Sequence, residues 1–313
     1  MPPGASTGPL IGVVGPTASG KTDLALALAA KWPVEILVAD SRQVYRGMDV
    51  GTATPDREAL QRVPHHLIDL VEPTDSFTVA RWVELARSRI PEIAGRGRIP
   101  MIVGGTGLYV SALLDGHDYA SQPWSPEIRR RLTDELAAHG LDAMAARLAT
   151  IDPNAAARTD LANPRRVLRA IERAEAGGRS LPARNAPHAG RVALLALSRP
   201  RHELVNRIEA RTEWLFAHGL LDEVRRLLDG ATTPDSHPMT GHGYAESARF
   251  LAGEWSLDEA IRVTALRTRQ YAKRQLTWFR RDPRIVWIAA GDRAGDDPAL
   301  VAEADRVLRA ALS

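Results

Sequence analysis

A glycine-rich stretch near the start of the chain, VGPTASGKTDLALALAA at residues 14–30, restricts the fold more than any other feature of the sequence. It contains a glycine, four further residues, Gly-Lys and a threonine, which is the P-loop pattern. The apolar run at residues 10–14 predicts a β-strand before it, and residues 21–31 predict a helix after it. A strand, this turn and a helix in this order form the context in which loop amides bind phosphate, so the sequence predicts a phosphate site.

Short apolar runs alternate with helical patterns along most of the chain. We predict strands at residues 10–14, 35–39, 99–103 and 191–197, helices at residues 21–31, 79–94 and 106–114, and long helical stretches at residues 201–229 and 257–280. A last apolar run, RIVWIAA at residues 284–290, can add an edge strand. Short buried strands separated by helices predict an α/β fold with a P-loop and a mostly parallel, doubly wound sheet.

The strand signal is absent from residues 117–189. Two segments there, SPEIRRRLTDELAAHGLDAMAARLATIDP and NPRRVLRAIERAEAGG, have helical periodicity and begin at Ser-Pro and Asn-Pro signals. We therefore expect a helical domain at residues 117–189, inserted into a catalytic core made of residues 1–116 and 190–313. Residues 177–189, rich in Gly, Pro, Ala and Asn, are typical of a mobile connection.

Composition excludes several classes of protein. The chain has no cysteine, which excludes disulfides and thiolate metal sites, and its nine histidines show no zinc-like spacing. Its N-terminus lacks the pattern of a signal peptide, and no apolar run is long enough to span a membrane. We expect a cytoplasmic monomer with no membrane partner, and the sequence pI of about 9.5 permits a polyanionic partner.

The residues of the P-loop have defined chemical tasks. Backbone N–H groups and the helix N-terminus bind phosphate, the Lys21 ammonium adds positive charge, and the Thr22 hydroxyl can ligate Mg²⁺. Asp40 ends the predicted strand at residues 35–39, which places its carboxylate near the ligand crevice of a parallel sheet. From the residues alone, Asp40 is a metal ligand, a general base or a cap of the following turn, and the phosphates can belong to an NTP.

Several longer phrases narrow this interpretation: GPTASGKT, ADSRQVYRGMDVGTATP, HHLID, GGTGLY and RQYAKRQLTWFRR. In this order and with these separations, they resemble the tRNA dimethylallyltransferase family, whose members prenylate the adenosine on the 3′ side of certain anticodons. The similarity extends from about Leu10 to about Arg281. A P-loop alone is common to many ATP-binding families, whereas DSRQVYRG together with GGTGLY is highly specific.

The resemblance implies that the donor is dimethylallyl diphosphate and that the P-loop holds the diphosphate leaving group. It implies that Asp40 is the general base for the adenine N6 amine, that Thr106 and Arg211 act on the diphosphate, and that Mg²⁺ is the cofactor, bound by Thr22. The diphosphate-binding residues expected from the motif are Gly15, Thr17, Ala18, Ser19, Gly20, Lys21 and Thr22.

The acceptor implied by the resemblance is the anticodon stem-loop of tRNA, on which the helical insertion would close. Residues 262–281 contain seven basic side chains and no acidic one, interleaved with aromatic residues. This composition favours contacts with RNA phosphates and bases, although a basic run can also be an ordinary solvated helix face. The tRNA-binding residues we expect are Ser41, Arg42, Gln43, Arg165, Arg166, Lys273 and Arg274.

Two positions depart from the family pattern. Thr54 stands where a lysine normally follows DVGTA, and His242 stands where an aliphatic residue commonly precedes Gly-Tyr. Two other functions stay open: an isopentenyltransferase that acts on free adenine nucleotides, and a P-loop module that binds or hydrolyses an NTP. The basic segment and the insertion favour tRNA over free nucleotides, and a preference for an allylic diphosphate over ATP or GTP would exclude the NTP-binding module.

Overall fold

The computed structural model describes residues 8–118, 125–176, 183–184 and 187–313. The chain divides into two compact units, one made of residues 1–113 and 188–313 and the other of residues 114–187. The second unit begins and ends within a few residues of the expected insertion at 117–189. The connection expected at residues 177–189 lies mostly outside the described residues.

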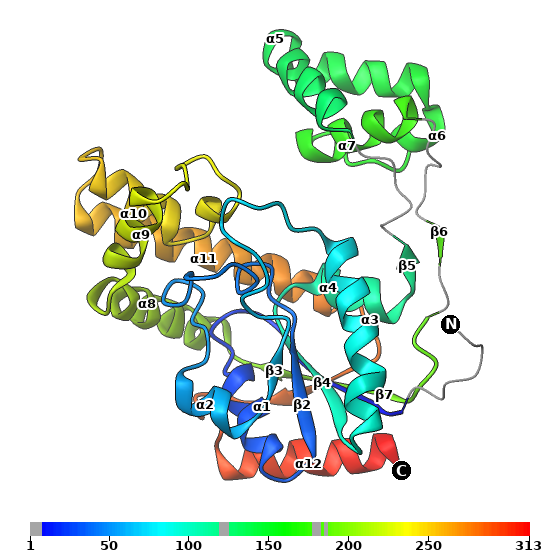
Figure 1. Cartoon of the computed structure of the whole chain (residues 1–313), viewed down its shortest axis with the longest axis vertical. Helices are drawn as coiled ribbons and strands as arrows, with labels where there is room; N and C mark the ends of the chain where they lie inside the picture. Colours follow the sequence, from blue (N-terminus) through cyan, green and yellow to red (C-terminus); the bar gives the residue numbers. More distant parts are fainter. Residues whose placement is uncertain (1–7, 119–124, 177–182, 185–186) are drawn as a thin grey trace. The chain divides into compact units, whose positions relative to one another are not determined.

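A six-stranded parallel sheet forms the centre of the first unit, with the strand order β3-β2-β4-β1-β7-β8 (Figure 1). The strands are β1 (Leu10–Val14), β2 (Val34–Val38), β3 (His65–His66), β4 (Ile99–Gly104), β7 (Val192–Ser198) and β8 (Ile285–Ala289). This sheet confirms the α/β prediction, and β8 is indeed an edge strand. The two-residue edge strand β3 has no counterpart in the sequence prediction.

Helices connect the strands along the chain, and one further helix comes after the last strand. They are α1 (Lys21–Ala29), α2 (Arg57–Arg62), α3 (Val79–Gly95), α4 (Gly107–Leu114), α8 (Arg201–Ala217), α9 (Leu220–Asp229), α10 (Tyr244–Leu251), α11 (Leu257–Phe279) and α12 (Pro298–Leu312), with a 3-10 turn η1 (Pro238–Thr240). The stretch at residues 201–229 consists of two helices because Gly219, with a φ of 101°, starts a new helix. None of the described helices is both long and apolar enough to cross a bilayer.

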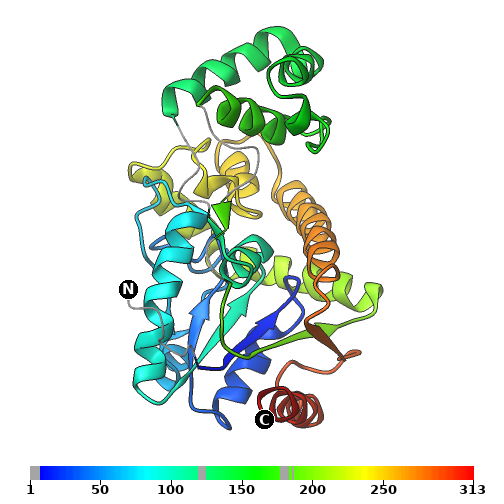
Figure 2. The ribbon, with the colours of Figure 1, turned by 90° about the vertical axis from the view of Figure 1, so that its right-hand side faces the viewer.

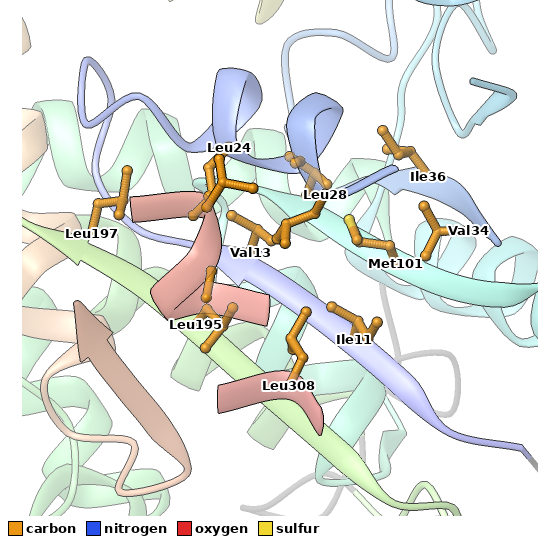
Figure 3. Close-up of a cluster of buried hydrophobic side chains, with 14 of the residues drawn as sticks. Ile11, Val13, Leu24, Leu28, Val34, Ile36, Met101, Leu195, Leu197 and Leu308 are labelled. Atoms are coloured by element: carbon orange, nitrogen blue, oxygen red, sulfur yellow. The ribbon is translucent and has the colours of Figure 1, made fainter. Parts of the chain in front are cut away.

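The main hydrophobic core lies between the sheet, α1 and α12. Figure 3 shows Ile11 and Val13 of β1 beside Leu24 and Leu28 of α1 and Leu308 of α12. All five side chains are fully buried. Since β1 is a central strand, this core fixes the position of the loop that joins β1 to α1.

The second unit is mostly helical, with α5 (Pro126–Ile151), α6 (Pro153–Ala156) and α7 (Pro164–Glu175) and the antiparallel two-residue strands β5 (His117–Asp118) and β6 (Ala183–Arg184). Figure 2 shows α5 and α7 packed together. The side chains of Ser125 and Asn163 cap these helices by accepting hydrogen bonds from the backbone N–H three residues later. The unit has its own core, which includes Leu132, Leu148 and Ile171.

Candidate active site

The P-loop follows β1 and ends at the N-terminus of α1. Gly15 and Gly20 have φ values of 135° and 89°, which glycine adopts without strain, and Ala18 between them has a φ of 60°. The helix begins at Lys21, whose ammonium group lies 3.3 Å from the Pro16 carbonyl oxygen. The positive end of the helix dipole and the lysine charge therefore coincide, an arrangement that binds anions.

Two arginines that are distant in sequence donate hydrogen bonds to backbone carbonyl oxygens of the P-loop. Arg199 Nε donates to the Ser19 carbonyl oxygen at 2.7 Å, and Arg207 Nε donates to that of Ala18 at 3.0 Å. The Ser19 hydroxyl is buried and has no hydrogen-bond partner among the described residues. A buried hydroxyl without a protein partner fits a loop that is completed by a bound phosphate. The sequence interpretation gave these arginines no role.

Asp40 follows β2, and Thr106 follows β4, the adjacent strand of the sheet. The Thr106 hydroxyl accepts a hydrogen bond from the Ser41 N–H at 3.0 Å, and the Thr106 N–H donates to the Ala39 carbonyl oxygen at 3.0 Å. One Asp40 carboxylate oxygen accepts from the Arg42 N–H at 2.9 Å. Asp40 therefore caps the turn after β2, and the same carboxylate also lines the cavity described below.

The glycines of GGTGLY permit three close approaches. A β-carbon on Gly104 would lie 2.1 Å from the carbonyl oxygen of the residue after β2. On Gly105 it would lie 2.3 Å from Gln275 Nε2, and on Gly107 it would lie 2.3 Å from the indole ring of Trp278. These distances are too short for any β-carbon, so the turn after β4 fits directly against both β2 and α11.

A cavity of about 480 Å³ lies beside the P-loop within the first unit. It brings together most of the residues selected from the sequence: Thr17, Ala18, Lys21, Thr22, Asp40, Ser41, Arg42, Gln43 and Arg211. Gly15, Ser19 and Gly20 belong to the same loop, and Thr106 is bonded to the turn that carries Asp40. The lining also contains residues to which the sequence interpretation gave no site role, among them His242, Tyr244 and Gln275.

Two positively charged side chains, those of Lys21 and Arg211, lie near Asp40. Burial lowers the pKa of Lys21 to about 8, the nearby Asp40 carboxylate opposes this shift, and Arg211 adds to it. Burial also lowers the pKa of Arg211, again against the effect of Asp40. Both side chains are cations at neutral pH, because a lysine with this pKa stays mostly protonated and a guanidinium does not lose its proton in proteins. Two partly desolvated cations suit a multiply charged anion such as a diphosphate.

The two departures from the family pattern lie in different surroundings. The Thr54 hydroxyl is 3.0 Å from that of Thr52, within the loop before α2. His242 lines the cavity, with its ring centroid 5.3 Å from that of Tyr271. Burial lowers the pKa of His242 to about 4, and its Nδ1 atom is buried without a hydrogen-bond partner among the described residues. At neutral pH His242 is therefore an uncharged ring in the cavity wall.

Two of the residues expected to bind tRNA beside the cavity already make structural contacts. The Arg42 guanidinium donates to the Thr240 hydroxyl at 3.0 Å, next to further contacts with η1. The Gln43 side chain donates to the Thr52 carbonyl oxygen at 3.1 Å. Arg42 and Gln43 therefore hold neighbouring loops in place, whatever they contact in a complex.

The basic run on α11 is less one-sided than its sequence indicates. Its first three arginines pair with acidic residues from outside the run: Arg262 with Glu259, Arg267 with Glu246 and Arg269 with Glu209. Lys273 and Arg274, by contrast, are exposed and have no ion-pair partner in the described part of the chain. They lie outside the cavity lining, beside Trp278, which is 41% exposed.

Arg165 and Arg166 belong to the second unit. Both are exposed in the first turn of α7, and an Arg166 nitrogen lies 3.6 Å from a carboxylate oxygen of Asp160. Neither of them lines the cavity of the first unit.

Comparison with known proteins places these features in one family. The family model described as IPP transferase matches residues 43–282, and the model described as isopentenyl transferase matches residues 9–70. The tRNA dimethylallyltransferase of Anaeromyxobacter dehalogenans (strain 2CP-C) is 50% identical over 288 residues, which cover 90% of this chain and 94% of that protein. The corresponding protein of Thermomicrobium roseum is 44% identical over 282 residues, covering 89% and 85%.

Solved structures agree with this assignment. The full-length tRNA isopentenylpyrophosphate transferase from Bacillus halodurans superposes with a TM-score of 0.74 at 36% identity, covering 98% of this chain and 97% of that one. The tRNA delta(2)-isopentenylpyrophosphate transferase from Staphylococcus epidermidis gives a TM-score of 0.68 at 32% identity, covering 97% and 98%. The P-loop fold expected from the sequence is thereby confirmed. The chain belongs to the tRNA dimethylallyltransferase family.

Proposed function

We propose that this chain transfers the dimethylallyl group of dimethylallyl diphosphate to N6 of the adenosine on the 3′ side of the anticodon in tRNA, and releases diphosphate. The family to which it belongs consists of prenyltransferases, and its relatives are named tRNA dimethylallyltransferase. The single observation that carries the proposal is the cavity that joins an anion-binding P-loop, Lys21 and Arg211 to the carboxylate of Asp40.

The leaving group is the diphosphate. The P-loop amides and the N-terminus of α1 hold it, and Lys21 and Arg211 supply positive charge. Charge accumulates on the diphosphate as the allylic C–O bond breaks, so these interactions are stronger in the transition state than in the ground state. This difference is what accelerates the reaction.

Mg²⁺ fits the groups that surround the diphosphate site. Thr22 lines the cavity and offers a hydroxyl oxygen, and no cluster of three His, Cys, Asp or Glu residues that could hold a metal occurs in the described part of the chain. A protein site with few ligands is typical for Mg²⁺, which keeps several waters and takes phosphate oxygens from the substrate. Bound there, Mg²⁺ would neutralise negative charge on the diphosphate.

Asp40 is the general base. The N6 amine is conjugated with the purine ring and is a weak nucleophile. Its lone pair forms the new N–C bond to the allylic carbon, the electrons of the C–O bond leave with the diphosphate, and the Asp40 carboxylate takes the proton from N6. The hydrogen bond from the Arg42 N–H fixes one carboxylate oxygen of Asp40.

Surfaces outside the cavity support RNA as the acceptor. Exposed Lys273 and Arg274 on α11 and Arg165 and Arg166 on α7 have the charge that RNA phosphates require. Trp278 presents an exposed ring to which a base can stack. A free adenine nucleotide would need only the cavity, so these surfaces favour tRNA over the nucleotide alternative.

A direct test uses Asp40→Asn in single-turnover reactions with saturating donor and tRNA over a series of Mg²⁺ concentrations. The amide keeps the shape of the carboxylate but cannot accept the proton, so the rate should fall by roughly 10² to 10⁴ while both substrates still bind. Asp229→Asn, at an exposed aspartate at the end of α9, is the matched control. A rate restored by Mg²⁺ would make Asp40 a metal ligand instead, and prenylation of AMP in preference to tRNA would replace the acceptor.

A further inference from the structure

Gln275 joins two loops of the cavity through both ends of its side-chain amide. Its Oε1 atom accepts a hydrogen bond from the backbone N–H of Thr17 at 2.8 Å. Its Nε2 atom donates to the carbonyl oxygen of Gly105 at 2.9 Å. Only 6% of the residue is exposed, so water competes poorly for these two hydrogen bonds.

Both partners of Gln275 adjoin functional residues. Thr17 belongs to the P-loop, and Gly105 directly precedes Thr106, whose hydroxyl holds the turn that carries Asp40. Gln275 therefore lies between the part of the site that holds the leaving group and the part that receives the proton.

The fit at this position is tight. The position of a β-carbon on Gly105 is only 2.3 Å from Gln275 Nε2, so the amide reaches the turn only because that residue is a glycine. Asparagine has a shorter side chain, and glutamate, when ionised, has no donor for the carbonyl oxygen. Glutamine is the residue whose length and donor-acceptor pair match the two loops.

The helix that carries Gln275 packs on the P-loop with one face and meets solvent with another. Ala272, one turn before Gln275, belongs to a buried cluster with Ala18 of the P-loop. Lys273 and Arg274, its neighbours in sequence, are exposed. A change at Gln275 therefore alters the inner face of α11 and leaves the exposed basic face in place.

We propose that Gln275 is a positioning residue, which holds the P-loop and the turn at residues 105–106 at the separation that diphosphate binding requires. It acts through Thr17 and Gly105 and not by contact with the reacting atoms. The proposal rests on the proposed function, because the ligand of the P-loop is taken to be the diphosphate of the donor.

The first experiment measures the binding of inorganic diphosphate with Mg²⁺ by calorimetry, so that no prenyl transfer is needed. Gln275→Leu should weaken this binding about 10- to 30-fold, the effect of losing two ordinary hydrogen bonds. The affinity for an anticodon stem-loop RNA should stay within about twofold of the wild type, since the exposed face of α11 is unchanged. Gln270→Leu, the same substitution at an exposed position of α11, is the control and should change neither.

The second experiment separates positioning from a general loss of structure. In Gln275→Glu, a protonated carboxyl can still donate to Gly105 and accept from Thr17, whereas the ionised form cannot donate and adds negative charge near the diphosphate. Relative to the wild type at the same pH, diphosphate binding by this variant should be weakened less at pH 5 than at pH 9, because the protonated form that keeps both hydrogen bonds is more populated at low pH.

Diphosphate affinity that is unchanged in Gln275→Leu would overturn the proposal. A deficit in Gln275→Glu that is the same at all pH values would overturn it as well, because it would show that the hydrogen bonds are not what matters. If diphosphate binding behaves as expected but no RNA is prenylated, the proposed function fails and the role of Gln275 at the phosphate site stands. The two failures are therefore distinguishable.

Discussion

Replacing Glu223 should detach the loop at residues 49–54 from α9 and so destabilise one wall of the cavity. The Glu223 carboxylate is 1% exposed and accepts four hydrogen bonds. Three come from the backbone N–H groups of Asp49, Val50 and Gly51, at 2.8, 2.8 and 3.1 Å. The fourth comes from the Tyr244 hydroxyl at 2.7 Å. No other contact described for this loop has so many hydrogen bonds on one side chain.

The magnitude follows from these four donors. Glu223→Ala leaves them all without their acceptor, and each buried unsatisfied donor costs about 1 to 3 kcal/mol. The wild-type carboxylate itself carries a desolvation cost that the variant recovers, and water can reach part of the loop. We therefore expect the free energy of unfolding to fall by about 3 to 5 kcal/mol, the usual range for breaking a buried charged contact.

Glu223→Gln should cost less because it keeps the volume and one acceptor oxygen. If its NH₂ group occupies the Oε1 position, the Tyr244 hydroxyl can rotate and accept from it, which leaves the Gly51 N–H as the one donor that faces another donor. The expected loss is about 1 to 3 kcal/mol. Glu223→Ala should therefore have the lowest free energy of unfolding, Glu223→Gln an intermediate one and the wild type the highest.

Urea denaturation at pH 7 measures these differences. The control is Glu213→Gln, at an exposed glutamate of α8, which should be within about 0.5 kcal/mol of the wild type. The reasoning is refuted if Glu223→Ala is no less stable than Glu223→Gln, or if both match the control.

Three further outcomes are expected. Lys21→Ala should lose roughly 2 to 4 kcal/mol of transition-state stabilisation, and near-normal turnover would contradict the role of the P-loop. In the wild type, diphosphate affinity should decline as the pH rises through about 8, where Lys21 loses its proton, and this decline should be absent from the variant. Lys273→Ala combined with Arg274→Ala should weaken tRNA binding and flatten its salt dependence while donor binding is kept; an unchanged salt slope would place the RNA contacts elsewhere. His242 has a pKa of about 4 in the folded protein, below its unfolded value, so protonation favours unfolding and stability falls as the pH drops from 6.5 towards 4. His242→Leu should lessen this fall in urea titrations, and a pH profile identical to that of the wild type would contradict this explanation.

Local patterns were enough to predict the strands and the P-loop. The sequence predictions for β1, β2, β4 and β7 agree with the structure to within one residue, since each is a short apolar run bounded by polar or turn residues. The P-loop needs only glycines at fixed spacing between a strand and a helix. Some missed elements have weak local signals, since β3 has only two residues and α2 only six. The fifteen-residue helix α12 was missed as well.

The partners of individual side chains could not be predicted from local patterns, because they depend on residues that are distant in sequence. The basic run on α11 contains no acidic residue, yet Arg267 and Arg269 pair with Glu246 and Glu209, which come from α10 and α8. Composition within a segment shows its charge, but it does not show which of those charges neighbouring helices neutralise. The two residues selected on α11 for tRNA binding are Lys273 and Arg274. That both are exposed became known only from the structure.

The sequence by itself determined that this chain is an α/β protein with a P-loop, and that Lys21, Thr22 and Asp40 lie near one another, because strand, turn and helix are encoded by neighbouring residues. The tertiary structure alone decided what holds that site in shape. Arg199, Arg207 and Gln275 reach the P-loop from positions 180, 189 and 258 residues away from their partners. Hydrogen bonds of this kind depend on distance and direction in space, and a linear pattern contains neither.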